Sequence, residues 1–402
     1  MTVCIIGGGA SGMAAALASA QTGARTILLE RQNRVGRKLL ATGNGRCNLT
    51  NLSSPMGRYH GNQESFSAYA LDRFSPRETL QWFSQMGLLS VAEPSGRVYP
   101  YSDQANSVVD VLRFALAQAG VELRCDWEVA KVRKQEGGFG IESTAGEKLS
   151  CDRLIVACGG LAGSKLGGSM SGYKLLRGLG HSCTKLRPAL VQVETVWKGI
   201  NALKGVRANC AAKMTHDGFT VTASQGEVQF TDYGLSGPVI FEISRDVCTA
   251  PGLWQCQMDF LPHVEEETLL EALTVRCKLD LRAEDLLTGI LHNRLGRVLC
   301  AQAGISLYTP LRQLERQELL ELARQVKSFT LDIARPLGMD SAQVTAGGIL
   351  TGEFDPETME SRLVPGLFAC GEVLDIDGDC GGWNLQWAWS SGRLAGQFAG
   401  KE

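Results

Sequence analysis

Several features that define large classes of protein are missing from this sequence. Its 402 residues include 40 Lys and Arg against 42 Asp and Glu, so the basic excess typical of nucleic-acid binders is absent. No apolar run approaches the roughly 20 residues that span a bilayer. The N-terminus shows no basic segment followed by a cleavage site, so we expect no secretory signal. These absences favour a cytoplasmic protein that acts on a small molecule, with no nucleic-acid or membrane partner, and they leave the oligomeric state open.

Cysteine and histidine are present but lack metal-ligand spacing. The 13 cysteines form no Cys-x-x-Cys pair, which argues against zinc and iron–sulfur sites and against a disulfide framework. We therefore expect no metal and free thiols of a reducing compartment. Glycine, by contrast, is abundant at 47 residues and clusters near both ends of the chain. Because glycine lets the backbone approach a ligand closely, this distribution predicts a site assembled from both ends.

The chain opens with a predicted βαβ unit and hence a parallel sheet. The motif Gly7-x-Gly9-x-x-Gly12 lies between the first strand and its helix, and Glu30 ends the second strand. In this context the glycines allow a tight turn, the approach of a pyrophosphate and close helix packing. The helix N-terminus offers free N–H groups to the phosphates, and the carboxylate can accept hydrogen bonds from a ribose. The pattern predicts a dinucleotide site.

A second glycine signature near the C-terminus favours FAD over NAD as that dinucleotide. An apolar strand ends in Gly371-Glu372, a carboxylate suited to the ribitol chain, and Gly381-Gly382 opens the last helix. A helix N-terminus at the flavin ring would stabilise its anionic reduced form. The middle of the chain lacks a second strand–Gly-x-Gly-x-x-Gly–helix unit, so we expect no dedicated nicotinamide domain.

Composition changes near Pro188 and changes back near Val344, which predicts an insertion. The expected fold class is α/β, a two-dinucleotide-type FAD-binding Rossmann domain with an inserted β-rich domain and a helical subdomain. The predicted boundaries are 1–189 plus 341–402, 190–262 plus 328–340, and 263–327. Helical periodicity predicts helices over 107–119, 264–277, 283–303 and 310–328, the last beginning at a Thr-Pro pair, whereas 31–60 shows no clear period and predicts a long loop.

The part of this loop from residue 37 to residue 51 has the chemistry of a cofactor-binding segment. Lys38 and Arg46 can neutralise pyrophosphate charge. Asn44 and Asn48 offer neutral donors and acceptors suited to the flavin's amide-like edge. Cys47 is the one cysteine inside a motif, and we interpret it as a packing or cofactor contact rather than a redox thiol, since no resolving cysteine is adjacent.

At this point the sequence resembles the BaiN-type flavoproteins, a family that includes a reductase of unsaturated 3-keto bile acids and an aminoacetone oxidase. The resemblance covers nearly the whole chain. The matching motifs are residues 37–51, 96–100, 230–238, 344–349 and 371–378 through Gly392. Cys158, Cys380 and Trp383 depart from the residues more usual in the family, which puts one hydroxyl contact and the choice of substrate in question.

The glycine signatures and the resemblance together imply a set of residues that hold FAD without a covalent bond. Tyr233 and Tyr99 are the candidate proton donors. The predicted FAD contacts are Gly7, Gly9, Ala10, Ser11, Gly12, Glu30, Arg31, Lys38, Thr42, Gly43, Asn44, Arg46, Cys47, Asn48, Val129, Ala157, Gly159, Gly160, Gly371, Glu372, Asp377, Gly382, Trp383, Asn384 and Leu385.

Two enzymatic hypotheses follow, and they differ in how electrons reach and leave the flavin. In the first, NAD(P)H is the transient donor and reduced FAD passes hydride to a C=C bond conjugated to a carbonyl. In the second, a small amine or amino ketone reduces the flavin and oxygen reoxidises it to give hydrogen peroxide. A third hypothesis, a flavin-stabilised protein that binds RNA through the helical insert, is disfavoured by the near-neutral charge.

Overall fold

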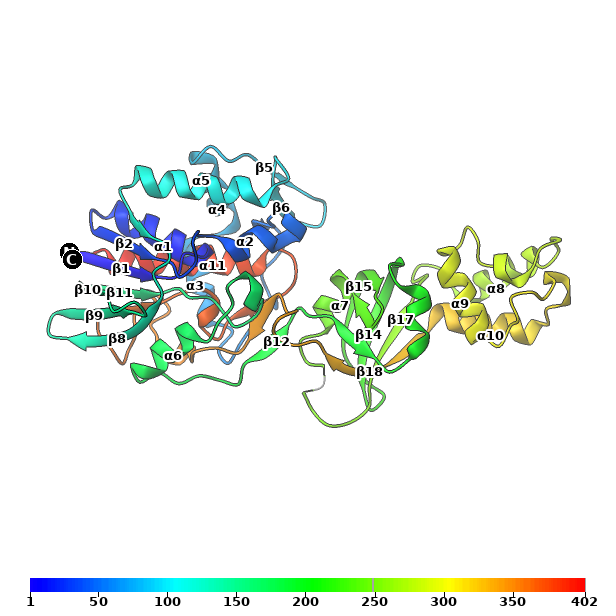
Figure 1. Ribbon diagram of the computed structural model, residues 1–402. Coiled ribbons are helices and arrows are strands. Elements are labelled where there is room, and N and C mark those ends of the chain that lie inside the picture. Colours follow the sequence, from blue (N-terminus) through cyan, green and yellow to red (C-terminus); the bar gives the residue numbers. More distant parts are fainter. Residues whose placement is uncertain (248, 402) are drawn as a thin grey trace. The chain divides into compact units, whose positions relative to one another are not determined.

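The structure is a computed structural model that describes residues 1–247 and 249–401. The chain divides into two compact units, Met1–Pro188 with Gln343–Glu402, and Ala189–Ala342. The first unit contains both ends of the chain, which lie next to each other (Figure 1). Among the described residues, no helix combines the length and the apolar character that crossing a membrane requires.

A five-stranded parallel sheet forms the centre of the first unit. Its order is β20-β11-β1-β2-β7, from Leu367–Ala369, Arg153–Val156, Thr2–Ile6, Arg25–Leu29 and Glu122–Arg124. Ile6 aligns with Leu29 on one side and with Val156 on the other, and Val156 aligns with Ala369. The residues that follow these strands therefore lie along one carboxyl edge, the edge at which open α/β sheets bind ligands. The α/β fold class is confirmed.

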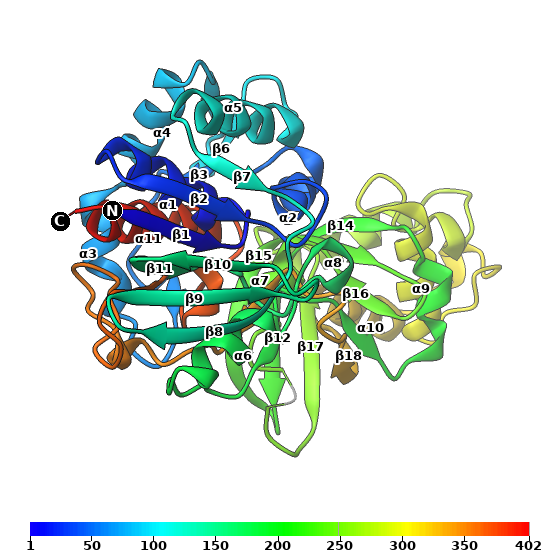
Figure 2. The same ribbon diagram turned by 60° about the vertical axis from the view of Figure 1, so that its left-hand side comes forward.

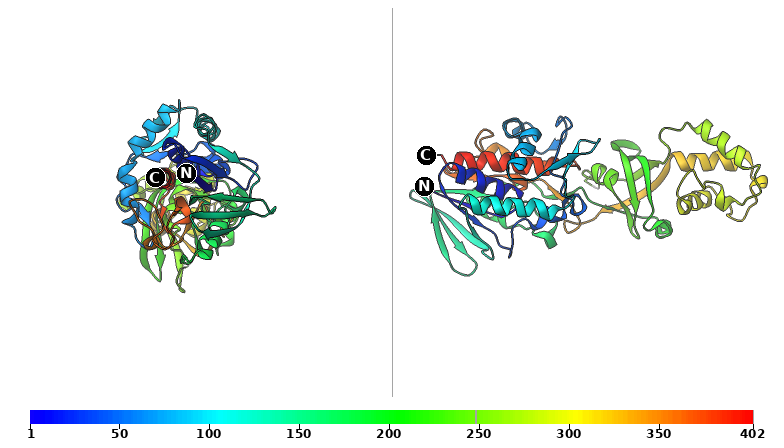
Figure 3. Two further views of the ribbon diagram at one scale, coloured as in Figure 1. Left: turned by 90° about the vertical axis from the view of Figure 1, so that its left-hand side faces the viewer. Right: turned by 90° about the horizontal axis from the view of Figure 1, so that it is seen from above.

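Two long helices from opposite ends of the sequence pack against each other in this unit. Helix α1 (Ala10–Gln21) and helix α11 (Trp383–Ala399) lie side by side (Figure 3, right). A Cβ placed on Gly392 would overlap the carbonyl of Ser11, and one on Gly396 would overlap the carbonyl of Ala15. Because both contacts advance by four residues in the same direction, the helices run parallel and their backbones touch.

Smaller elements complete the first unit. The antiparallel sheet β10-β9-β8 lies beside β11 and β1 (Figure 2). The helices are α2 (Arg37–Ala41), α3 (Phe66–Arg73), α4 (Pro76–Gln85), α5 (Ala105–Gln118) and α6 (Ser171–Gly178). The remaining strands are β3 (Thr50–Asn51), β4 (Tyr59–His60), β5 (Ser90–Ala92), β6 (Arg97–Pro100), β8 (Val129–Gln135), β9 (Gly138–Ser143), β10 (Lys148–Cys151), β19 (Val344–Ala346) and β21 (Asp377–Gly378). Strand β12 (Arg187–Ala189) includes the last two residues before the boundary and the first one after it.

The second unit is a closed six-stranded barrel with helices. The strand order is β13-β16-β15-β14-β17-β18, from Val193–Thr195, Gly234–Ser236, Phe219–Phe230, Arg207–His216, Trp254–Asp259 and Phe329–Pro336. Its helices are α7 (Pro238–Ile243), α8 (Glu266–Arg276), α9 (Asn293–Gln302) and α10 (Arg316–Lys327), of which α8, α9 and α10 gather in one group (Figure 1, yellow). Barrel and helices share one hydrophobic core.

Several expected elements differ from those observed. The predicted loop over 31–60 contains helix α2, and α5 begins two residues before Ser107. The helix expected over 283–303 is broken, because Gly289 adopts φ +81° and only Asn293–Gln302 is α-helical. The helix expected from Pro310 begins at Arg316, since Glu315 and Glu318 form a capping box that fixes the start there.

Candidate functional site

The glycine turn after β1 has the geometry that a bound pyrophosphate requires. Gly7 has φ +110°, and a Cβ there would overlap the carbonyl of Ala157, while a Cβ on Gly12 would overlap the carbonyl of Gly7. A Cβ on Gly9 would meet no atom within 4 Å. Two glycines are thus needed for packing, and the middle one borders open space at the N-terminus of α1. This open space fits a dinucleotide phosphate.

Glu30 holds the glycine turn as well as standing where a ribose is expected. Its Oε2 accepts a hydrogen bond from the N–H of Gly8 at 2.7 Å, and its Oε1 accepts one from Gln32 at 2.8 Å. A carboxylate oxygen can accept more than one hydrogen bond, so each retains capacity for a ribose hydroxyl. The structure therefore assigns this side chain a contact within the turn that the sequence did not predict.

Lys38 and Glu372 join the two ends of the chain. Lys38 Nζ lies 2.6 Å from Glu372 Oε2, with side-chain exposures of 31% and 19%. Glu372 Oε1 accepts a hydrogen bond from the backbone N–H of Thr345 at 2.8 Å. A Cβ on Gly160 would overlap that same Oε1, so three other predicted or motif positions meet at the carboxylate of Glu372.

The strand end at Gly371 lies against α1 and α11. Gly371 has φ +75°, and a Cβ there would come within 2.5 Å of Ser11 Oγ. Its N–H donates to Ser391 Oγ at 3.0 Å, and its carbonyl accepts from the Trp387 indole N–H at 3.1 Å. Predicted FAD contacts from residues 11 and 371 are therefore neighbours, as a site built from both ends requires.

The turn after α2 has an unusual backbone. Gly43, Asn44 and Cys47 all adopt positive φ angles, of 57°, 57° and 64°. The Thr42 carbonyl accepts a hydrogen bond from the N–H of Cys47 at 3.0 Å, which closes the turn. Cys47 is fully buried, and this burial raises the pKa of its thiol to about 12. The thiol stays protonated at neutral pH, which supports a packing role over redox chemistry.

Arg46 contacts carboxylates rather than open space. Its guanidinium forms ion pairs with Glu93 and Asp103, and its Cζ lies 3.8 Å above the centre of the Tyr99 ring. The charge expected to meet a pyrophosphate is thus balanced within the protein. Tyr99 is 6% exposed, and burial raises the pKa of its hydroxyl, so the group is a protonated donor at neutral pH. The Tyr99 ring also borders the turn at Gly43.

The N-terminus of α11 is held by asparagine side chains predicted to contact FAD. In the orientation that satisfies its amide, Asn48 accepts a hydrogen bond from the N–H of Gly382 at 3.2 Å. Asn384 accepts one from the N–H of Gly378 at 2.8 Å and donates to its carbonyl at 2.6 Å. The Trp383 side chain is buried against Tyr59 with ring centroids 6.1 Å apart. These three side chains fix the start of the helix.

The remaining predicted positions fall on the same unit, with one exception. Arg31 donates to the carbonyl of Gly167 at 2.8 Å, and a Cβ on Gly159 would meet open space. Tyr233 belongs to the barrel unit, where the turn carbonyl of Tyr233 accepts from Thr195 at 3.0 Å. Also in the first unit are Ala10 at the start of α1, Val129 at the start of β8, Ala157 after β11, Asp377 in β21 and Leu385 in α11.

Sequence reasoning assigned no role to Thr345 and Ser391. Thr345 Oγ1 accepts a hydrogen bond from the N–H of Ala162 at 2.9 Å, and its own N–H binds Glu372. Both residues connect the C-terminal segments to the predicted cofactor residues. Both residues lie in family-like motifs, Thr345 in 344–349 and Ser391 in the block that ends at Gly392, and this was the available signal. The contact of Ser391 with Gly371 depends on how α11 packs.

Comparisons with known proteins identify the family of the chain. The sequence profile of the HI0933-like protein Rossmann domain matches residues 1–398. The chain is 38% identical to the 3-dehydro-bile acid delta(4,6)-reductase of Clostridium scindens, covering 98% of each. It is 33% identical to the ribosomal RNA dihydrouridine synthase of Escherichia coli, covering 98% of this chain and 96% of that one. The structure also resembles that of a 3-ketosteroid-delta4-(5alpha)-dehydrogenase from Rhodococcus jostii in complex with 4-androstene-3,17-dione, with a TM-score of 0.50. The two chains are 16% identical, and the match covers 100% of this chain and 96% of the other, which shows a shared fold.

The class is thereby defined as that of FAD-dependent oxidoreductases built on a Rossmann domain. The chain belongs to the HI0933-like family, and within it to the BaiN type.

Proposed function

We propose that this protein reduces a C=C bond conjugated to a carbonyl in a small hydrophobic substrate, with NAD(P)H as the electron source. The observation that carries the proposal is the 38% identity to a 3-dehydro-bile acid delta(4,6)-reductase over 98% of both chains. The dihydrouridine synthase relative supports the same bond type, since dihydrouridine is uridine whose C5=C6 bond, conjugated to a carbonyl, has been saturated. Bound FAD would supply the hydride.

The residues that would hold FAD fit its two halves. The open space at Gly9 and the N-terminus of α1 suit the pyrophosphate, and Glu30 suits the adenosine ribose. Glu372, paired with Lys38, suits the ribitol hydroxyls. The turn after α2 and the start of α11, where Asn48 contacts Gly382, would lie at the flavin ring.

Tyr99 is the proton donor that we favour for the carbon next to the carbonyl. Its hydroxyl is protonated at neutral pH because burial raises its pKa, and the Arg46 guanidinium stacked on its ring restricts its orientation. Hydride addition to the far carbon leaves negative charge that the carbonyl shares, and one proton then completes the saturated product. Tyr233 of the barrel unit remains the second candidate.

The charge of the barrel unit favours a small substrate over RNA. Residues 189–342 contain 15 Lys and Arg against 19 Asp and Glu. Binding a nucleic-acid backbone depends on cations that neutralise phosphates, and a segment with an acidic excess gains little from it. We therefore assign to this chain the chemistry common to both relatives and a substrate without phosphates.

An anaerobic stopped-flow experiment tests the proposal. The purified protein is reduced by NADH or NADPH, followed near 450 nm, and then mixed with a steroid enone or with a uridine-containing RNA. Flavin reoxidation by the enone, with a product heavier by two hydrogens, is the expected result. Reoxidation by the RNA alone would assign the protein to nucleic-acid chemistry, and peroxide release in air with no reaction with either would support the oxidase.

The proton donor is tested by a matched pair of variants. Tyr99→Phe should slow reoxidation by the enone roughly 10²-fold or more and leave flavin reduction unchanged, since general acids contribute about 10²–10⁴-fold. Tyr101→Phe, two residues away and exposed, is the control and should match the unaltered protein. An unchanged Tyr99→Phe together with a slowed Tyr233→Phe would transfer the role to the barrel unit.

A further inference from the structure

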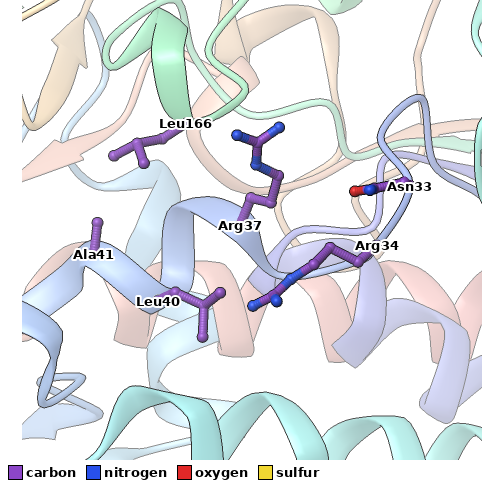
Figure 4. A pocket seen from close by; sticks show the side chains of 6 residues that line it. All are labelled: Asn33, Arg34, Arg37, Leu40, Ala41 and Leu166. Atoms are coloured by element: carbon purple, nitrogen blue, oxygen red, sulfur yellow. The ribbon is translucent and has the colours of Figure 1, made fainter.

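Side chains of α2, of the segment before it and of Leu166 line a hollow of about 590 Å³ (Figure 4). It is lined by Asn33, Arg34, Arg37, Leu40, Ala41 and Leu166. None of these six residues is among the predicted FAD contacts, although Lys38 of the same short helix is one. The hollow is therefore adjacent to the predicted FAD contacts without including any of them, although Arg37, Leu40 and Ala41 belong to the same segment 37–51.

The cations at this hollow are not neutralised by carboxylates. Arg34 is exposed and makes no hydrogen bond or ion pair within the part of the chain that the structure describes. Arg37 donates only to neutral oxygens, to Gln32 Oε1 at 2.5 Å and to the carbonyl of Lys165 at 3.3 Å. The ammonium group of Lys165 likewise has no partner among the described residues. Three uncompensated cations on neighbouring segments suit a doubly charged anion.

This arrangement contrasts with the neighbouring cations of the same region. Lys38 pairs with Glu372 at 2.6 Å, and Arg31 lies 4.0 Å from Glu128. The absence of a carboxylate at Arg34 and Arg37 is thus local to the hollow.

Apolar side chains form the rest of the lining. In Figure 4, Leu40 lies near the end of Arg34, and Leu166 lies near Arg37. A ligand that fills this space needs a phosphate for the two guanidinium groups and a flat, largely apolar ring for the leucines. Helix α2 ends at Ala41, directly before the turn at Thr42–Gly45 that is expected at the flavin ring. A long ligand bound here could therefore reach the flavin with its other end.

We propose that this hollow binds the adenosine end of NADPH, with the ribose 2′-phosphate between Arg34 and Arg37 and the adenine against Leu40 and Leu166. The inference rests on the proposed function and names its electron donor. A hydride leaves the dihydronicotinamide ring for FAD, which also takes a proton from solvent, and the oxidised nucleotide NADP⁺ departs. The phosphate contact makes the protein selective for NADPH over NADH.

The test compares nucleotides on the FAD-loaded protein under anaerobic conditions. The unaltered protein should reach half its maximal rate of flavin reduction at a lower concentration of NADPH than of NADH. Arg34→Ala and Arg37→Ala should each raise that concentration for NADPH about tenfold or more, the loss expected for a charged hydrogen bond, and change the NADH value less than about twofold. Arg77→Ala, at an exposed arginine of α4, is the control.

A binding probe separates the phosphate contact from the hydride step. Adenosine 2′,5′-bisphosphate should compete with NADPH in the unaltered protein, and adenosine 5′-monophosphate should compete far less; Arg34→Glu should remove the difference. Equal use of NADH and NADPH by the unaltered protein would overturn the inference. Loss of FAD in the arginine variants would also overturn it, because the hollow would then belong to the FAD site.

Failure of this inference can be distinguished from failure of the proposed function. Protein reduced by dithionite needs no nucleotide, so its reaction with the steroid enone tests the proposed function alone. An enone that reoxidises this protein while NADPH shows no preference leaves the proposed function intact and rejects the nucleotide site.

Discussion

Replacement of Gly396 by alanine tests the contact that joins the two ends of the chain. A Cβ at this position would overlap the backbone carbonyl of Ala15, which cannot rotate aside as a side chain could. Overpacking of this kind costs about 1–3 kcal/mol, and we expect the upper end because the obstacle is backbone. Alanine regains about 0.5–1 kcal/mol through its helix preference. The net loss is therefore about 2 kcal/mol, out of a total stability on the order of 5–15 kcal/mol.

Gly178→Ala in α6 is the matched control. Its Cβ would meet no atom within 4 Å, so the same chemical change should stabilise the protein by about 0.5–1 kcal/mol. In thermal melts followed by circular dichroism at a fixed excess of FAD, Gly396→Ala should melt about 4–8 °C lower and Gly178→Ala slightly higher than the unaltered protein. A Gly396→Ala protein that melts at or above the unaltered temperature would refute the parallel close packing of α1 and α11.

Four further outcomes are expected. A double-mutant cycle of Lys38→Met and Glu372→Gln should show a coupling of about 1 kcal/mol in thermal stability, because both side chains are partly exposed; additive effects would argue against the pair. Glu30→Ala should weaken FAD binding by about 1–3 kcal/mol, measured as flavin release on dilution; a variant that keeps all its FAD on dilution would show that Glu30 does not contact the ribose. Cys47 should resist iodoacetamide at pH 8 until the protein is denatured, since its thiol pKa is about 12; rapid native alkylation, read by mass spectrometry, would contradict its burial. Burial lowers the pKa of His181, so the unfolded chain binds the proton more readily and stability should fall as pH drops below about 6.5; a His181→Gln protein should lose part of that slope in melts at pH 7 and 5.

The features that could be predicted from the sequence are those with local causes. In the glycine turn after β1, Gly12 packs on the carbonyl of Gly7 five residues before it, and Gly7 packs on Ala157 at the end of the neighbouring strand. Gly9 borders open space. A local constraint also applies at Gly381-Gly382, where left-handed backbone at Gly382 precedes α11. Such constraints produce short sequence motifs, and the α/β class was predicted from these motifs.

The features that could not be predicted depend on distant partners. Lys38 and Glu372 are 334 residues apart, so no local pattern shows that the lysine meets a carboxylate. Arg46 has the charge expected at a pyrophosphate, yet its partners Glu93 and Asp103 lie on other segments of the fold. The segment between residues 285 and 293 has the apolar spacing of a helix. Leu286 and Leu287 are buried in the core, but they lie outside the helix, which begins at Asn293.

The connectivity of the two units has a consequence for how the activity can vary. The sheet, the glycine turn and the α1–α11 contact all lie in Met1–Pro188 and Gln343–Glu402, and each is complete without residues of Ala189–Ala342. The barrel unit closes its own sheet and has its own hydrophobic core. Substitutions in the barrel unit should therefore leave the backbone contacts at Gly371 and Gly396 undisturbed. Substitutions at the contact between α1 and α11 should lower the stability of the first unit, because the backbones of these helices touch there.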